Sequence, residues 1–155
     1  MASRVTVRTK PIAFPRRVDV RVGILEPGDE HEGGMTVGEL AEIHEFGLGD
    51  VPDRAPIRSF FDLTKADLVG IASKQFEIAA RGRADLPAFT LAAERVAVKA
   101  AAGLRNHIAF GNLEPDLAES TKKSKERRGI KPPWVPLIET GVLRNHYIGD
   151  AEVTP

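Results

Sequence analysis

Histidine and acidic side chains are the groups in this 155-residue chain best suited to metal or acid–base chemistry. The pair His44-Glu45 begins the His-Glu-x-x-His pattern, in which two imidazoles on one helix face bind zinc and the glutamate acts as a general base. Position 48 is Leu48, so the same face lacks the second imidazole. His31 lies among acids, but in a glycine-rich segment, residues 27–34, that preorganises ligands poorly. The sequence therefore predicts no metal site.

The other reactive side chains also lack the spacing of a catalytic site. His107 follows Asn106 on a predicted helix, and its amphipathic context predicts a position on the helix surface or in a groove. The chain has no cysteine, which excludes disulfides, thiolate nucleophiles and cysteine-ligated metals. No acid–base pair, nucleophile or phosphate-binding loop has a recognised spacing. We therefore expect a protein that is not an enzyme and uses no cofactor.

The composition is that of an ordinary globular domain. Hydrophobic residues make up 42% and charged residues 28% of the chain, and no apolar run approaches the ~20 residues of a membrane span. The first residues, 1–8, lack the apolar core of a secretory signal. One domain, made in the cytoplasm and without a membrane partner, is the expectation.

The periodicity of apolar residues predicts an α+β fold with a small antiparallel sheet packed with two long α-helices. Apolar and polar residues alternate over residues 18–25, as in a half-buried strand. Asp62 is expected to cap a helix that continues to about Arg81, and a second helix follows Pro87 to about Phe110. The apolar stripes of both helices are typical of a core.

Shorter elements and the domain boundaries follow from caps, glycines and prolines. Thr36 and Glu39 have the spacing of a capping box and predict a helix that ends at Gly47. Residues 118–128 predict a short helix, and residues 143–148 predict a closing strand. We expect an extended basic arm over residues 1–17, one domain over 18–150 and a C-terminal tail over 151–155.

Charge is segregated although the net charge is zero. Residues 1–21 carry six Lys or Arg and one Asp, residues 22–53 carry nine acids and no Lys or Arg, and residues 121–131 carry six bases and one acid. Opposite patches could meet across a head-to-tail contact between copies. The last segment is either a solvated helix face or a surface for DNA, formed by Lys122, Lys123, Lys125, Arg127 and Arg128.

Several residues have types and positions suited to subunit contacts. Of the adjacent aromatics Phe60 and Phe61, one is expected to pack inward, and the other to anchor a contact. Trp134, the only tryptophan, follows Pro132-Pro133 in an extended connection. It either fills the core of its own domain or anchors an interface.

Four segments in a fixed order resemble the virion-morphogenesis, or tail-completion, proteins of tailed bacteriophages. They are Ile-His-Glu-Phe-Gly at 43–47, Pro-Ile-Arg-Ser-Phe at 56–60, the Ser/Thr-Lys-basic segment at 120–128, and Leu-Ile-Glu-Thr-Gly-Val-Leu-Arg-Asn at 137–145. The resemblance covers about residues 35–148. This chain departs from the pattern in the loop over 48–55 and at His146-Tyr147.

The resemblance implies a structural virion protein that forms a homo-oligomeric ring, expected to be a hexamer, at the neck between tail and head. Its partners would be the tail-tube or tail-terminator protein, the head–tail connector proteins and the double-stranded DNA that crosses the channel. The implied assembly residues are Phe46, Gly47, Arg58, Phe60, Trp134, Thr140, Gly141 and Arg144.

Within this resemblance, Phe46 and Gly47 would lock the exit of their helix. Arg58 and Phe60 would join a contact within or between subunits, and Thr140-Gly141 would turn the C-terminal strand into place. Tail termination and head closure remain alternatives, because both functions also need a small ring-forming domain. Non-specific DNA binding is the alternative of a different class.

Overall fold

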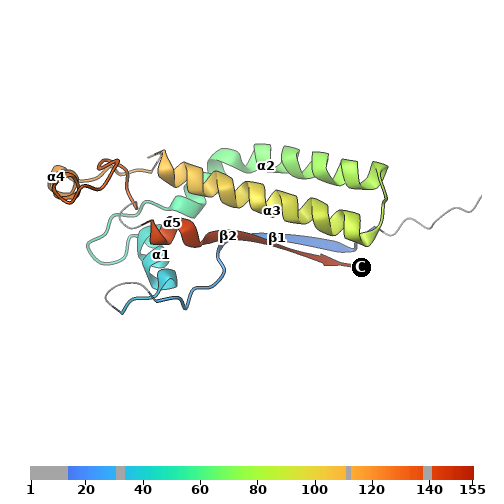
Figure 1. Ribbon diagram of the computed structural model, residues 1–155, viewed down its shortest axis with the longest axis horizontal. Coiled ribbons are helices and arrows are strands. Elements are labelled where there is room, and N and C mark those ends of the chain that lie inside the picture. Colours follow the sequence, from blue (N-terminus) through green and yellow to red (C-terminus); the bar gives the residue numbers. More distant parts are fainter. Residues whose placement is uncertain (1–13, 31–33, 111–112, 138–140) are drawn as a thin grey trace, which may run out of the picture.

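Two long helices form a hairpin that lies against a two-stranded sheet (Figure 1). The structure is a computed structural model and describes residues 14–30, 34–110, 113–137 and 141–155. Helix α2 (Pro56–Arg81) packs along α3 (Leu86–Ala109), and α3 in turn packs on strands β1 (Arg17–Ile24) and β2 (Tyr147–Thr154). This arrangement confirms the predicted α+β fold with a small antiparallel sheet and two long helices.

The sheet joins the two ends of the described chain. Its antiparallel register pairs Arg17 with Thr154 and Ile24 with Tyr147. Of the alternating apolar residues that predicted the first strand, Val22 and Ile24 pack against the core and Val20 is exposed, and Gly149 of β2 lies against α3. A Cβ at position 149 would lie 2.3 Å from the carbonyl oxygen of Ala97, so only glycine permits this close approach of strand and helix.

Helix α3 is the centre of the core. Asp85 caps its N-terminus by accepting a hydrogen bond from the backbone amide of Ala88 at 3.1 Å. Its predicted apolar stripe is buried throughout, at Phe89, Ala93, Val96, Ala100, Leu104 and Ile108. Alanines beside this stripe let α2 and the sheet approach closely.

Helix α2 begins earlier than the sequence predicted. It starts at Pro56, where the fixed φ of proline suits the first helical position, and not after Asp62. The predicted cap at Asp62 is therefore wrong, because Glu45 from another helix caps this N-terminus instead. Its predicted end is confirmed, since the helix stops at Arg81 and Gly82 follows as the C-cap.

The C-terminal segment also differs from the prediction. Residues 143–148 were expected to form a strand, but Val142–His146 form helix α5, because Gly141 has a left-handed backbone (φ 77°) and accepts the hydrogen bond of Asn145. The strand β2 follows it. The predicted tail over 151–155 is wrong for residues 151–154, which pair with β1. The domain therefore includes these residues and also Arg17.

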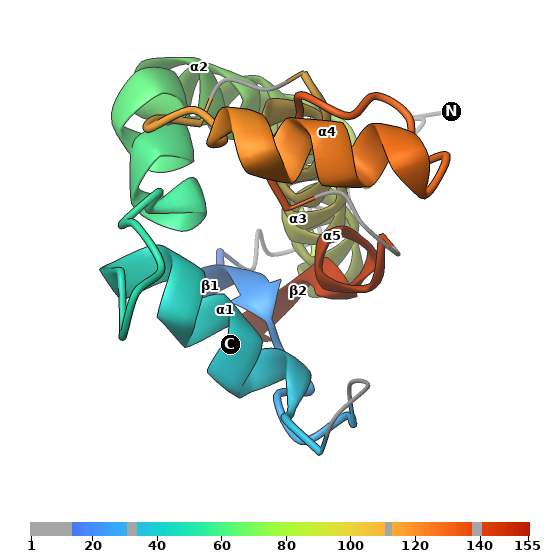
Figure 2. The same ribbon diagram turned by 90° about the vertical axis from the view of Figure 1, so that its left-hand side faces the viewer.

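Three short helices gather at the end of the molecule away from the α2–α3 connection (Figure 2). They are α1 (Val37–Phe46), α4 (Glu119–Arg127) and α5. The prediction of a capping box at Thr36 is confirmed, as is that of the short helix over 118–128. The main core cluster lies near this end and contains Val37, Ala41, Phe60, Leu104, Ile108, Leu113, Leu143 and Tyr147.

Most of the predicted basic arm, with residues 1–13, lies outside the described residues, as does His31. Phe14 is described, and its ring lies 5.5 Å from that of Phe89. Within the described ranges, none of the helices has the length and hydropathy that crossing a bilayer requires.

Candidate assembly site

The first motif segment, residues 43–47, forms the end of α1 and a tight exit from it. Gly47 ends the helix with φ 65°, and its amide donates to the carbonyl of Ile43 at 2.9 Å. A Cβ at position 47 would lie 2.6 Å from the backbone nitrogen of Asp53. Only glycine fits here, which supports the prediction that Gly47 locks the helix exit.

Glu45 connects this segment to the second one, residues 56–60. Its buried carboxylate accepts hydrogen bonds from the backbone amides of Ile57 at 2.9 Å and Arg58 at 3.1 Å. The N-cap residue of α2, Ala55, has φ 38° and no capping side chain, so Glu45 supplies the cap from α1. The two motif segments are thus parts of one structural unit.

Arg58 reinforces the same unit from its surface side. Its guanidinium bonds Glu45 through Nε at 3.1 Å and through Nη2 to the Glu45 carbonyl, and it pairs with Asp53 at 3.0 Å. These hydrogen bonds, first to Glu45 and then to Asp53, raise the pKa of Arg58. The guanidinium also lies 5.6 Å from the centre of the Phe46 ring. Arg58 therefore makes a contact within its own chain, and Phe46 remains 60% exposed above it.

The last motif segment meets the first two in the core. Leu143 of α5 and Phe60 of α2 are buried in one cluster, so Phe60 fills the core of its own chain. Gly141 starts α5 by its left-handed backbone, and Arg144 is half-buried on that helix. Thr140 lies outside the described residues. Segments more than 80 residues apart in the sequence, 43–47 and 141–145, thus come together at one end of the molecule.

Two polar groups at this end are buried without a hydrogen-bond partner among the described residues. They are Nδ1 of His44 and the hydroxyl of Tyr147. Burial and then the nearby charge of Arg54 lower the pKa of His44 to about 4, while burial and then Glu45 raise the pKa of Tyr147. Both groups are therefore neutral at pH 7, which suits a packed core better than proton transfer.

One pair that the sequence analysis missed has the geometry of a catalytic dyad. The hydroxyl of Ser59 lies 2.9 Å from Nε2 of His107, and burial lowers the pKa of this histidine. The prediction of a surface or groove position for His107 is wrong, since it is only 7% exposed. Its spacing from Leu104 and Ala100 on the buried stripe is the signal that could have placed it inside.

The dyad lacks the other parts of an acyl-transfer site. Within the described part of the chain, Ser59 is the only side chain that hydrogen-bonds the His107 ring. A Ser–His nucleophile also needs an orienting acid and donors for the oxyanion. The Ser59 hydroxyl instead hydrogen-bonds the buried His107 imidazole between α2 and α3. The centre of the Phe60 ring lies 6.0 Å from the centre of the His107 ring. The described residues likewise contain no group of three or more potential metal ligands.

The five predicted DNA-facing bases divide into two groups. Lys125 is only 4% exposed and donates from Nζ to the carbonyl of Val135 at 2.7 Å, so the prediction that it faces DNA is wrong. Lys122 forms ion pairs with Asp116 at 2.7 Å and Glu119 at 3.0 Å. Lys123 and Arg127 of α4 and the C-cap residue Arg128 are exposed.

Trp134 lies on the surface beside this helix. It is 62% exposed, so the interpretation that it fills its own core is wrong. Its neighbours Val135 and Pro136 are buried, and the Lys125 bond to Val135 connects them to α4. This anchoring presents an exposed indole at the end of the molecule where α1 also lies.

No family model, curated protein or solved structure matches this chain.

Proposed function

We propose that this chain is a structural, non-enzymatic virion protein of a tailed bacteriophage that completes the tail or neck and helps to join tail and head. It acts as a subunit of a ring, for which a hexamer is the working model. It is made in the host cytoplasm and remains in the particle. Tail terminators, tail-tube proteins and head–tail connectors are the proposed neighbours.

The observation that carries this proposal is the convergence of the motif segments into one structural unit. The Glu45 carboxylate accepts hydrogen bonds from the Arg58 side chain and from the backbone amide of Arg58 at the start of α2. Phe60 and Leu143 are buried in the same core cluster. The hydrogen bonds and packing contacts of these motif residues hold the elements of the fold together. Around them lie exposed aromatics, Phe46 and Trp134, of the type that is enriched at the centres of protein interfaces.

Non-specific DNA binding is less well supported as the main function. Lys122 is paired with Asp116, Lys125 is buried against the Val135 carbonyl, and the chain carries no net charge. The exposed bases of α4 suit a secondary contact with phosphates in the channel.

The test is assembly with the neighbours encoded in the same genome. We would measure the mass of the protein by light scattering, alone and mixed with the tail-tube and connector proteins, at low and high salt. A defined ring that binds these proteins is the expected result. A protein that stays monomeric and binds none of these proteins would contradict the proposal.

Surface variants make this test specific. Phe46→Ala and Trp134→Ala remove exposed rings without opening the core, and we expect either to reduce co-assembly. Val69→Ala, also at an exposed apolar residue but on the middle of α2, is the matched control. Normal complementation of a gene deletion by the Phe46→Ala, Trp134→Ala double variant would count against the assigned site.

A further inference from the structure

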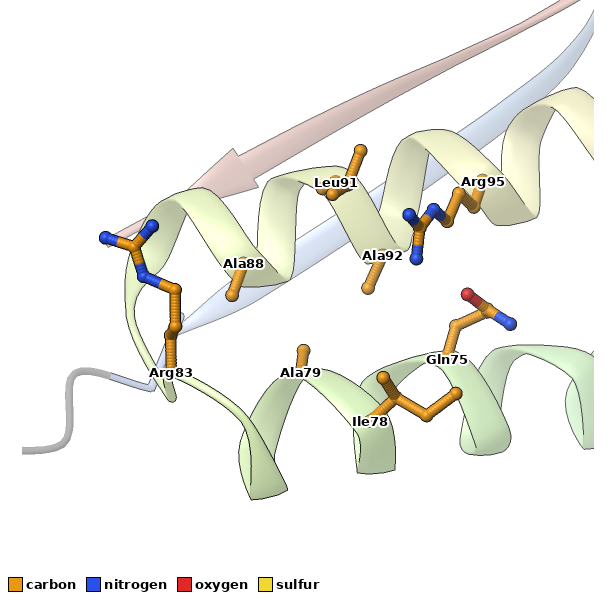
Figure 3. Close-up of a pocket in the computed structure, with 8 residues that line it drawn as sticks. All are labelled: Gln75, Ile78, Ala79, Arg83, Ala88, Leu91, Ala92 and Arg95. Atoms are coloured by element: carbon orange, nitrogen blue, oxygen red, sulfur yellow. The ribbon is translucent and has the colours of Figure 1, made fainter.

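An apolar groove lies between α2 and α3 near the end where the two helices connect (Figure 3). Its volume is about 140 Å³, and small side chains from both helices, Ala79, Ala88 and Ala92, face one another across it. Ile78 and Leu91 line it and are 52% and 47% exposed. Arg83 and Arg95 lie at its two ends, and the Arg83 guanidinium is paired with Asp85 at 3.1 Å. The groove therefore combines an alanine floor, the exposed apolar side chains of Ile78 and Leu91, and the positive charge of Arg95 at one end.

The opposite end of the molecule carries a segment with complementary properties. We call residues 46–50 the acidic knob: Phe46, Gly47, Leu48, Gly49 and Asp50. Phe46 and Leu48 are 60% and 49% exposed, and Asp50 is exposed beside them. The left-handed backbones of Gly47 and Gly49 turn the segment sharply. It belongs to the region, residues 22–53, that has nine acids and no Lys or Arg.

We propose that the α2–α3 groove of one copy binds the acidic knob of a second copy. The ring of Phe46 suits the size of the groove, since an apolar cavity of ~150 Å³ holds one benzene molecule. Asp50 would then lie near Arg95, which gives charge complementarity at the edge of an apolar contact. This inference rests on the self-assembly part of the proposed function and names the surfaces that carry it.

The positions of the two surfaces determine the kind of assembly. The knob follows α1 at one end of the molecule, and the groove lies toward the other end (Figure 1). A contact between two different surfaces is heterologous, so it leaves one knob and one groove unused in each dimer. Repeated addition gives a ring when the rotation between copies closes and an open filament when it does not. The basic segment over residues 1–21 is a poorer occupant, because it has the same sign of charge as Arg83 and Arg95.

A charge exchange tests the contact. We would measure self-association of the full chain by analytical ultracentrifugation for Arg95→Glu, Asp50→Arg and the double variant, with circular dichroism to verify folding. Each single reversal is expected to weaken association about tenfold or more, and the double variant to recover most of it. Lys99→Glu, exposed on the same helix, and Glu42→Arg, exposed on α1, are the matched controls and should have little effect.

Truncation of the apolar partners gives a second, independent measurement. Leu91→Ser in the groove and Phe46→Ala in the knob should each weaken association, and the two together should cost less than the sum of the single losses. A wild-type chain that stays monomeric at every concentration, or association that is indifferent to Arg95→Glu and Leu91→Ser, would overturn the proposal.

The outcomes separate this contact from the role in tail completion. If a ring binds the tail-tube and connector proteins and the groove variants do not change its assembly, the proposed knob-and-groove contact is refuted and the proposed role in the particle stands. If the single charge reversals weaken self-association, the double variant restores it, and the protein does not bind the tail-tube and connector proteins, the contact is supported and the role in tail completion is refuted.

Discussion

The carboxylate of Glu45 accepts hydrogen bonds from both the backbone amide and the Nε of Arg58, each at 3.1 Å. One buried side chain on α1 thereby caps the first turn of α2 and fixes the arginine that lies over it. Few other contacts join α1 to α2.

Glu45→Gln is expected to destabilise the protein by about 2 kcal/mol, because one carboxylate oxygen becomes an amide donor that faces a backbone N–H. Chemical denaturation measures this loss. Glu42→Gln, exposed on the same helix, should change the free energy of unfolding by less than about 0.5 kcal/mol. Equal effects of the two variants would show that the Glu45 cap is dispensable.

Comparison of Gly47→Ala with Gly49→Ala separates the cost of a left-handed backbone from the cost of steric overlap by the new Cβ atom. Their φ angles are 65° and 66°, but a new Cβ would meet the Asp53 backbone only at position 47. We expect Gly49→Ala to cost about 1 kcal/mol for the left-handed backbone alone. Gly47→Ala should cost clearly more in the same thermal unfolding experiment, and similar losses would contradict the described packing.

Gly149→Ala tests the contact between sheet and helix. The new Cβ would lie 2.3 Å from the Ala97 carbonyl, whereas a Cβ at Gly23 in the neighbouring strand would meet nothing within 4 Å. We expect Gly149→Ala to lower the melting temperature strongly and Gly23→Ala to leave it nearly unchanged. A Gly149→Ala protein as stable as wild type would show that β2 does not approach α3 so closely.

Protonation of His44 is expected to destabilise the fold in acid. Its pKa falls from 6.5 in the unfolded chain to about 4 in the folded one, so the folded state binds the proton less readily. The contribution is fully present above pH 6.5 and is lost as the pH falls to about 4. At most about 3 kcal/mol is involved.

Urea denaturation across this pH range measures the effect. The neutral isostere His44→Leu should flatten the dependence between the two pKa values, apart from the smaller contribution of His107 in the same direction. An unchanged slope in the variant would assign the pH dependence to other groups.

Lys125→Met is expected to loosen the segment that carries Trp134, because it removes the Nζ bond to the Val135 carbonyl. Trp134 is the only tryptophan, so its fluorescence anisotropy reports on this segment alone. Anisotropy should fall in Lys125→Met and stay constant in Lys123→Met, whose exposed side chain is on the same helix. If anisotropy fell in Lys123→Met and not in Lys125→Met, the Lys125 hydrogen bond would not be what holds the Trp134 segment in place.

Periodicity and caps predicted the parts of the fold that depend on local sequence. The stripe of α3, the capping box at Thr36 and the stop at Gly47 are of this kind. The start of α2 was missed because its cap comes from Glu45, and the end of β2 was missed because its partner strand begins at Arg17. Both depend on residues distant in sequence, which a local pattern does not reveal.

The candidate site shows the same division. The sequence pattern singled out Phe46, Gly47 and Arg58, and the structure brings them together. A run of like charges predicted an exposed surface, but it could not show that Lys125 turns inward to a backbone carbonyl. The Ser59–His107 pair joins two helices, so no spacing within either helix indicates it.

The pairing of Arg17 with Thr154 also has a consequence for the order in which the parts of the chain fold. The α2–α3 hairpin closes through a short connection, whereas the sheet closes a loop that contains almost the whole described chain, at a larger cost in chain entropy. Contacts between distant residues form slowly for this reason. We expect the hairpin to form first and to serve as the template on which β1 and β2 meet, so that the sheet is the last element gained in folding and the first lost in unfolding.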